Sequence, residues 1–292
     1  MSHFLYYIGK KAILLFIKMF TPKIIHQTWK NHDVPRKLQR YADSCKQQND
    51  TYEYKLWTDD DLRALVVKEF PQYISAYDKF SHNIERVDFA RYVMMYSIGG
   101  VYADLDIQCL RPFDSLVAMN KPVLGTEPRE HRDELYQGRK YVICNALLIS
   151  PPGESLWLRI MEYIVRHYRP GVNPVVNTGP MALTFLYEED PSAYKGALIT
   201  NPCIFYSQTD FKTKIKQHIR DEEIPAISRE CSIMNAVAVH RWAHTWCGGN
   251  AADKSSDDGD EQQQTYNIVA MVLFFVLLTL TVVWLCMKKG NK

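Results

Sequence analysis

Residues 83–106 read NIERVDFARYVMMYSIGGVYADLD, and this stretch carries the strongest evidence for the fold. Residues 83–98 are apolar on nearly every side, which is typical of a buried helix. Gly99 and Gly100 end that helix, because glycine readily adopts the backbone conformation found just after a helix. Residues 101–106 alternate as a strand does, with residues two apart pointing to the same face. The stretch therefore predicts a buried helix followed by a strand.

Two aspartates, Asp104 and Asp106, share one face at the end of this strand. Aspartate is depleted from strands, and neighbouring carboxylates repel each other unless water or a cation lies between them. A hard divalent cation such as Mn²⁺ or Mg²⁺ prefers carboxylate and water ligands and often bridges to substrate phosphates. The pair therefore indicates a candidate divalent metal site.

The residues before this stretch alternate between strand and helix patterns. Strands are predicted at 22–29 and 52–58, and helices at 34–48 and 59–70. With the helix and strand described above, this order predicts an α/β domain with a largely parallel sheet. Such sheets bind ligands at the carboxyl ends of their strands, where the aspartate pair lies.

The later part of the domain continues the mixture of strands and helices. Strands are predicted at 142–150 and 236–242, and an amphipathic helix at 155–168. The segment PREHRDELYQGRK (128–140) is highly charged, which predicts a mobile loop.

Composition limits the classes of partner and cofactor. The 292 residues carry a formal net charge of +2, and the lysines and arginines are dispersed, so no nucleic-acid partner is expected. The seven cysteines form no CxxC pairs, which argues against zinc. Their odd number and wide spacing predict mostly free, buried thiols and leave one disulfide open.

Residues 268–287, IVAMVLFFVLLTLTVVWLCM, contain no charge. At about 1.5 Å per residue, a helix of this length spans roughly 30 Å, the thickness of a bilayer's hydrocarbon core. We therefore predict a single transmembrane helix over 267–287, with a basic tail at 288–292.

This span sets the expected organisation of the rest of the chain. The folded domain is predicted at 22–247, and the polar, acidic residues 248–266 predict a disordered linker. The apolar segment 1–21 fits a signal peptide, a signal anchor, an interfacial helix or an ordinary helix packed on the domain. The sequence leaves these alternatives open.

The flanking charges bear on which side of the membrane the domain occupies. Lys288, Lys289 and Lys292 follow the span, and positive charge favours the cytosolic side, which places the domain in the lumen of the Golgi or ER. The glycosylation sequon at 49–51 agrees with that orientation. A tail anchor, the alternative, would leave the domain cytosolic. The lumenal orientation is favoured.

Three charged residues interrupt the apolar helix. Glu85, Asp88 and Arg91 recur at three-residue spacing, so they share one helix face. Burying such a face is costly unless its charges are paired or bound to a polar group. Two interpretations stay open: an internal ion pair between Asp88 and Arg91, or a polar ligand lying over this face beside the aspartate pair.

The string RVDFARYVMMYSIGGVYADLD (86–106) resembles the signature of glycosyltransferase family 32, whose members carry a DXD sugar-binding region and include fungal α-mannosyltransferases. Four more segments resemble motifs of that family in the same order: PKIIHQTWK (22–30), YEYKLWTDDD (52–61), NTGPMALT (177–184) and AVHRWAHTW (238–246). Within the family, the sequence is most similar to mannosyl-inositol-phosphoceramide synthases. The resemblance implies a GT-A fold, a nucleotide-sugar donor, a divalent metal and retention of anomeric configuration.

The resemblance also implies roles for particular residues. Asp104, Asp106 and His240 match positions at the metal, where the cation offsets charge on the leaving diphosphate. Asp88 and Arg91 match positions that bind the donor sugar and, with Asp106, are the expected catalytic residues.

Further donor contacts are implied outside that set. Trp29 matches the position where the base or ribose packs, although a core role fits it equally. Tyr102, Thr245 and Trp246 match residues that line or close the donor site. The weaker correspondences are Asn145 and Thr178. No nucleophile is assigned, since front-face displacement needs positioning more than a side-chain nucleophile.

The sequence therefore predicts a metal-dependent retaining glycosyltransferase that moves a hexose, with mannose from GDP-mannose favoured, to a membrane lipid such as inositol phosphoceramide. One alternative is a UDP-sugar-dependent Golgi enzyme that acts on glycoprotein or other glycolipid glycans. A second is a catalytically dead sugar-binding membrane protein. A haloacid-dehalogenase-like phosphatase is disfavoured, because Gln108 stands where that motif requires Thr or Val.

Overall fold

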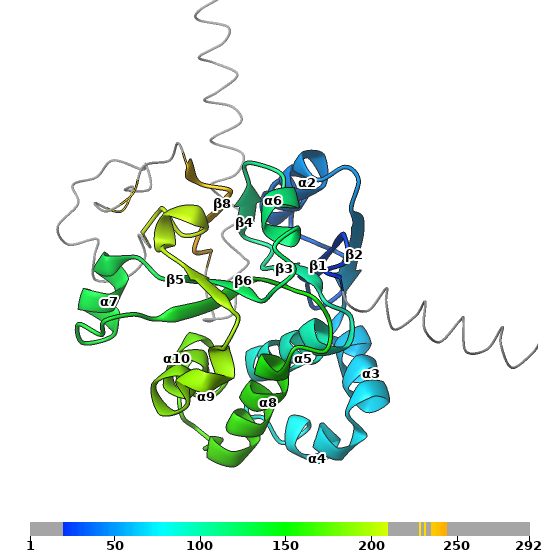
Figure 1. Cartoon of the computed structure of the whole chain (residues 1–292). Coiled ribbons are helices and arrows are strands. Elements are labelled where there is room, and N and C mark those ends of the chain that lie inside the picture. Colours follow the sequence, from blue (N-terminus) through cyan, green and yellow to red (C-terminus); the bar gives the residue numbers. More distant parts are fainter. Residues whose placement is uncertain (1–19, 210–227, 229–230, 232–234, 244–292) are drawn as a thin grey trace, which may run out of the picture. The chain divides into compact units, whose positions relative to one another are not determined.

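The computed structural model describes residues 20–209, 228, 231 and 235–243, all within one compact unit that ends at Ala243 (Figure 1). The predicted linker, transmembrane helix, basic tail and closing residues Thr245 and Trp246 lie outside the described residues, as does the N-terminal segment up to residue 19. In the part of the chain that is described, no helix is long and apolar enough to span a bilayer.

A six-stranded sheet forms the centre of the domain. Its strand order is β2 (Glu53–Trp57), β1 (Ile24–Thr28), β3 (Gly100–Ala103), β6 (Ile143–Ser150), β5 (Val123–Thr126) and β7 (Leu198–Thr200). Strand β1 is parallel to β2 and β3, and β5 is parallel to β7, whereas β6 is antiparallel to both β3 and β5. Five of these six strands therefore run in one direction. This confirms an α/β fold with a mixed but largely parallel sheet.

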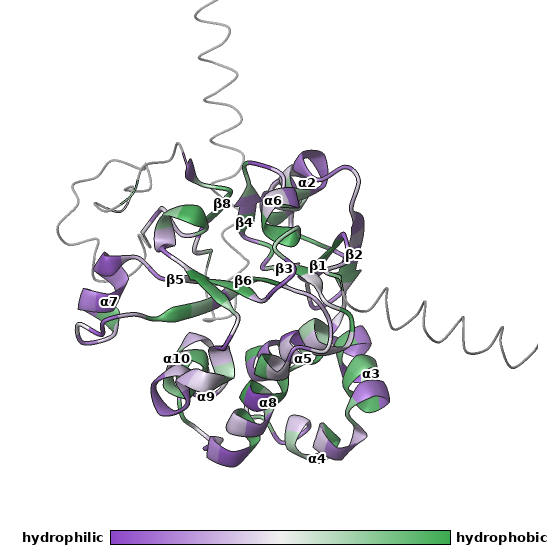
Figure 2. Ribbon diagram, in the orientation of Figure 1, coloured by the Kyte–Doolittle hydropathy of each residue, from purple (hydrophilic) through white to green (hydrophobic). Residues whose placement is uncertain are grey.

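Helices cover both faces of the sheet. One layer contains α3 (Asp59–Glu69), α4 (Ile74–Tyr77), α5 (Asn83–Ser97), α8 (Ser155–His167), α9 (Pro174–Asn177) and α10 (Pro180–Glu189) (Figure 1). The opposite layer contains α2 (Arg36–Gln48) and α6 (Asp114–Val117). Each layer packs its own apolar cluster on the sheet, and Figure 2 shows hydrophobic strands between helices with polar outer faces. The two-sided burial explains the largely apolar sequence of β6, all of whose residues are buried.

Helix α5 and strand β3 form as the opening stretch predicts. The helix is buried over most of its length, with Phe89 and Tyr92 fully enclosed. Gly99 and Gly100 follow with φ of +72° and +101°. A Cβ on Gly99 would lie 2.7 Å from the Ser150 carbonyl oxygen, so both conformation and space require glycine there.

A two-stranded sheet brings the end of the described chain back to the centre. Strand β4 (Ile107–Cys109) pairs with β8 (Ala238–His240) in antiparallel register, and Ile107 lies opposite His240. The alternation predicts one strand through residue 106, but β3 ends at Ala103. Asp104 and Asp106 therefore lie in the turn between β3 and β4. The tight turn directs the two side chains toward His240.

Two disulfides correct the prediction of mostly free thiols. Cys45 in α2 is bonded to Cys109 in β4, and Cys203 is bonded to Cys231. Among the described residues only Cys144, which is buried, is free. The bonded partners are 64 and 28 residues apart, so their pairing depends on tertiary contacts that the spacing of cysteines does not reveal.

The structure corrects two further expectations. The charged segment expected to be a mobile loop contains a helix, α7 (Arg129–Leu135), whose His131 is fully buried. The sequon residue Asn49 is 3% exposed, and its side-chain amide donates to the Cys45 carbonyl and accepts from the Phe113 amide. A glycan does not fit on a side chain held in this way, so the sequon gives no support for a lumenal orientation.

Candidate functional site

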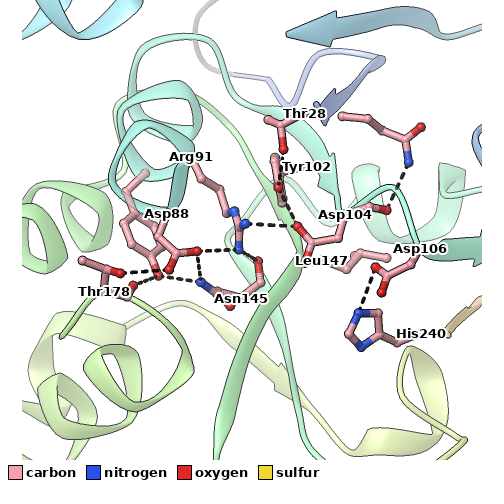
Figure 3. A network of polar contacts seen from close by, with 12 residues as sticks. Thr28, Asp88, Arg91, Tyr102, Asp104, Asp106, Asn145, Leu147, Thr178 and His240 are labelled. Atoms are coloured by element: carbon pink, nitrogen blue, oxygen red, sulfur yellow. Dashed lines mark hydrogen bonds and ion pairs between the residues drawn. The ribbon is translucent and has the colours of Figure 1, made fainter. Parts of the chain in front are cut away.

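Polar side chains gather where β1 and β3 end, at the edge that α/β sheets use for ligands (Figure 3). Thr28 comes from the end of β1, Tyr102 from β3, and Asp104 from the turn that follows. Asn145 comes from β6, the next strand of the sheet, so consecutive strands supply the site.

Asp104 is held by two charge-assisted contacts to the same oxygen. Its Oδ1 accepts hydrogen bonds from the Tyr102 hydroxyl at 2.6 Å and from Arg91 Nη2 at 3.0 Å. The Asp104 amide donates to the Ala146 carbonyl, which fixes the backbone. Within the described chain, Oδ2 accepts no hydrogen bond, and the side chain is 29% exposed. One oxygen is therefore oriented by the protein and the other is left for a ligand.

Asp106 faces the strand that returns from the other end of the domain. His240 Nε2 lies 3.0 Å from Asp106 Oδ1, and the Ala243 amide donates to Oδ2 at 2.8 Å. Burial would raise the pKa of Asp106, but the His240 imidazole and these hydrogen bonds outweigh burial and lower it. Burial likewise opposes protonation of His240, but Asp106 outweighs burial and raises the His240 pKa.

These residues fit a divalent metal ion. Asp104, Asp106 and His240 each offer one ligand atom, and the three atoms lie within 4.8 Å of one another. His240 Nδ1 is buried and has no hydrogen-bond partner in the part of the chain that is described. Two carboxylates and an imidazole form a donor set that suits a first-row divalent cation. The structure thus brings together all three predicted metal ligands.

Asp88 and Arg91 form the internal ion pair that was one of the two interpretations of the buried helix. Arg91 Nη1 lies 3.2 Å from Asp88 Oδ1 and donates to the Asn145 carbonyl at 2.7 Å. Asp88 also accepts from Asn145 Nδ2 and from the Thr178 hydroxyl, each at 2.9 Å. Burial raises the pKa of Asp88 to about 6, against the lowering effect of Arg91.

Arg91 links this pair to the candidate metal ligand Asp104. Its guanidinium contacts both Asp88 and Asp104 and lies 4.2 Å from the centre of the Tyr102 ring. Tyr102 is fully buried, and its hydroxyl also contacts Thr28 Oγ1 at 3.1 Å. It supports Asp104 through this hydroxyl, and its expected contact with a donor stays a prediction.

Two predicted residues lie away from this network. Glu85 is fully buried and accepts hydrogen bonds from the His82 amide, Asn177 Nδ2 and the Tyr168 hydroxyl. It therefore fixes the start of α5 and leaves the polar face to Asp88 and Arg91. Trp29 is half-buried against the small apolar cluster that contains Leu105, and its Nε1 donates to the Asp33 carbonyl.

Trp242 is the functional candidate that the sequence reading missed. Its φ is +50°, a conformation that bulky residues rarely adopt. Its ring lies 4.0 Å from that of His240 and 4.4 Å from that of His131, and Nε1 donates to the Gln208 carbonyl. The turn it makes brings the Ala243 amide onto Asp106. The only signal in the sequence is a tryptophan two residues after a candidate metal ligand.

A family model described as "Glycosyltransferase sugar-binding region containing DXD motif" matches residues 35–122, which include both aspartates of the candidate metal site. The predicted resemblance to this family is thereby confirmed. Inositol phosphoceramide mannosyltransferase 3 of Schizosaccharomyces pombe is 32% identical over 170 residues, 57% of this chain and 44% of that protein. Mannosyl phosphorylinositol ceramide synthase SUR1 of Saccharomyces cerevisiae is 29% identical over 58% of this chain and 42% of its own length.

The chain spans about half the length of the curated relatives it matches. Among solved structures, mouse xyloside xylosyltransferase 1 aligns with 75% of this chain and 97% of its own, at 14% identity and a TM-score of 0.44.

Proposed function

We propose that this chain transfers a hexose from a nucleotide sugar to a membrane lipid. The premise is that it contains a glycosyltransferase domain with a DXD sugar-binding region. GDP-mannose is the favoured donor and inositol phosphoceramide the favoured acceptor. The names of several relatives describe mannosylation of that lipid, and the family resemblance implies the GDP-linked donor. The proposed fold is GT-A, and the proposed reaction retains the anomeric configuration.

One observation carries this proposal: the convergence of Asp104, Asp106 and His240 at the carboxyl edge of the sheet. A divalent metal bound there would offset the charge that builds up on the leaving nucleoside diphosphate. The imidazole favours Mn²⁺ over Mg²⁺, since Mg²⁺ prefers an all-oxygen set of ligands.

The surrounding residues orient these ligands. Arg91 and Tyr102 fix one oxygen of Asp104, while His240 and the Ala243 amide fix both oxygens of Asp106. Ligands held in this way need little rearrangement when a donor binds. Asp88 is 4% exposed, so its proposed role is to hold Arg91 and Asn145 beside the sugar.

The transfer step requires no side-chain nucleophile. The acceptor hydroxyl oxygen bonds to the anomeric carbon on the face from which the diphosphate departs. The bond from that carbon to the diphosphate oxygen breaks, and the hydroxyl proton passes to the leaving diphosphate. Positioning of the two substrates can supply a large part of the rate in such a reaction, together with the stabilisation of the leaving diphosphate.

We also propose that the domain is lumenal in the Golgi or ER and is anchored by the predicted helix at 267–287. The two disulfides support an oxidising compartment, because structural disulfides are rare in the cytosol.

The proposal is tested with the full chain purified in mild detergent. Transfer to inositol phosphoceramide and hydrolysis of GDP-mannose, UDP-glucose and UDP-galactose are measured with Mn²⁺, with Mg²⁺ and with a chelator. We expect turnover of GDP-mannose with Mn²⁺, its loss with the chelator, and a product of retained configuration by NMR.

Two variants make the test specific to the site. Asp106→Asn removes a proposed metal ligand and is expected to abolish turnover. Asp78→Asn, the control, alters a surface ion pair with Arg63 and is expected to leave turnover unchanged. Failure of the chain to turn over any donor, or an unaltered rate in Asp106→Asn, would exclude this function. Turnover of UDP-sugars alone would reassign the donor.

A further inference from the structure

A basic surface borders the candidate site on the side of α2. Between Trp29 and Tyr41, the chain carries four cations against the single acid Asp33. These cations, here called the basic rim, are Lys30, Arg36, Lys37 and Arg40. All four are exposed, and three of them lie in the first turns of α2. The mechanism proposed above uses none of them.

Leu105 places the basic rim beside the acid turn. This residue stands between the two aspartates of the candidate metal site and packs in one apolar cluster with Leu38 of α2. Trp29 and Tyr41, which flank the rim in the chain, are partly buried against the same cluster. The helix that carries most of the rim therefore packs directly on the acid turn and turns its cations outward.

The charge of the basic rim is left uncompensated. Within the ranges that the structure describes, Lys30, Lys37 and Arg40 form no ion pair with an acidic side chain. No acidic residue lies in the first turn of α2, where the helix dipole favours acids over bases. The stability of the helix therefore does not explain why cations occupy these positions.

Tyr41 extends the positive charge from α2 toward the metal ligands. Arg40 donates to the Tyr41 hydroxyl at 3.3 Å, and its Cζ lies 5.1 Å from the centre of the ring. Arg241, which directly follows the candidate ligand His240, has its Cζ 6.0 Å from the centre of the same ring. Two guanidinium groups thus share one aromatic ring at the border of the site.

We propose that the basic rim binds the surface of a bilayer that contains anionic phosphodiester lipids. The cations are spread along the outside of a loop and a helix, so they match a layer of headgroups better than a single phosphate. A basic residue close to an anionic bilayer strengthens binding by about fivefold. Bound in this way, the domain holds the acid turn next to the membrane. The inference goes beyond the proposed function and rests on it only for the membrane location of the acceptor.

Amine labelling of the full chain in nanodiscs tests the proposal. The nanodiscs contain phosphatidylcholine alone or mixed with phosphatidylinositol, and mass spectrometry measures the labelling rate of each lysine. We expect labelling of Lys30 and Lys37 to slow about threefold to tenfold in the mixed nanodiscs and to recover at high salt, which screens charge attraction. Lys79, exposed between α4 and α5 in the other helical layer, is expected to keep its rate.

Two double variants make the labelling test specific. Arg36→Gln with Arg40→Gln removes half of the charge of the basic rim without altering the lysines that report on it, and is expected to abolish most of the slowing. Its matched control is Arg166→Gln with Arg169→Gln, two exposed arginines at the end of α8 in the other layer. The control is expected to label as wild type does.

Three outcomes would overturn the proposal. They are equal labelling of Lys30 and Lys37 in both kinds of nanodisc, unchanged slowing in the Arg36 and Arg40 variant, and equal slowing by GDP with Mn²⁺ in detergent without lipid. The last outcome would assign the basic rim to the donor diphosphate. Labelling does not depend on turnover, so a chain that turns over no donor would exclude the transferase function and leave the labelling result standing.

Discussion

Arg91 shows how a single residue joins two parts of the site. It contacts Asp88 on its own helix, the Asn145 carbonyl on β6 and Asp104 in the turn after β3. Its charge therefore compensates the buried carboxylate of Asp88 and also holds the half-buried carboxylate of Asp104 in place.

Asp88 gives a prediction for the pH dependence of stability. Burial raises its pKa from 3.8 to about 6 in the folded protein. The stability that this group contributes is therefore complete below pH 3.8 and is lost as the pH rises past about 6. Between pH 4.5 and 7.5, we expect the free energy of unfolding of wild type to fall by about 2 kcal/mol relative to Asp88→Asn. Urea unfolding of both proteins across this range measures the difference, and parallel curves would contradict the raised pKa.

Trp242 gives a prediction for metal binding. Trp242→Ala and Trp242→Gly both remove the ring between His131 and His240, and only glycine relaxes the positive φ. We expect both variants to bind Mn²⁺ roughly tenfold more weakly by calorimetry, as when a group that orients metal ligands is lost. The glycine variant should be more stable than the alanine variant by about 1 kcal/mol. Wild-type affinity in both variants would show that the ring does not position His240.

At the scale of elements, the site depends on one antiparallel strand of the main sheet and on a separate two-stranded sheet. Strand β6 runs antiparallel to its neighbours β3 and β5 and contributes Asn145 to the polar network. The β4–β8 pair is only three residues long, yet it positions His240. Such a short pair needs support from outside the sheet.

The Cys45–Cys109 disulfide provides that support by tying α2 to β4. Removing a native disulfide typically costs about 2–5 kcal/mol. We expect Cys45→Ser to lower the free energy of unfolding by that amount and to reduce Mn²⁺ affinity, because β4 begins directly after Asp106. Denaturant unfolding and calorimetry measure the two effects. Cys144→Ala, which alters a buried free thiol, is the control for loss of a cysteine alone, and equal effects in both variants would contradict a specific role for the disulfide.

At the scale of the whole molecule, a glycosylation assay tests the proposed lumenal orientation. In wild type, Asn49 is buried, so we expect no glycan. Asp33→Thr creates a sequon at Asn31, which is exposed. A lumenal domain should therefore gain one glycan in that variant, seen as a mass shift that an endoglycosidase reverses. Without this shift, the domain would be assigned to the cytosol.

Much of the fold follows from local sequence, whereas the completed site does not. Gly99 and Gly100, the apolar helix and the two aspartates are close in the chain, so their pattern predicts a helix, a strand and an acid pair. The contact between His240 and Asp106 joins residues 134 apart, and only the family resemblance indicated it. The disulfide pairing, the burial of Asn49 and the strained turn at Trp242 depend on how distant elements pack, which periodicity does not encode.

The position of the Cys45–Cys109 bond also makes the acid turn sensitive to redox conditions. Cys109 lies three residues after Asp106, so the bond ties the residues that follow the acid turn to α2. A chain in a reducing environment would carry the aspartates on an untied strand, with the lower Mn²⁺ affinity expected for Cys45→Ser. For the proposed transferase, donor turnover is therefore expected to rise when this bond forms.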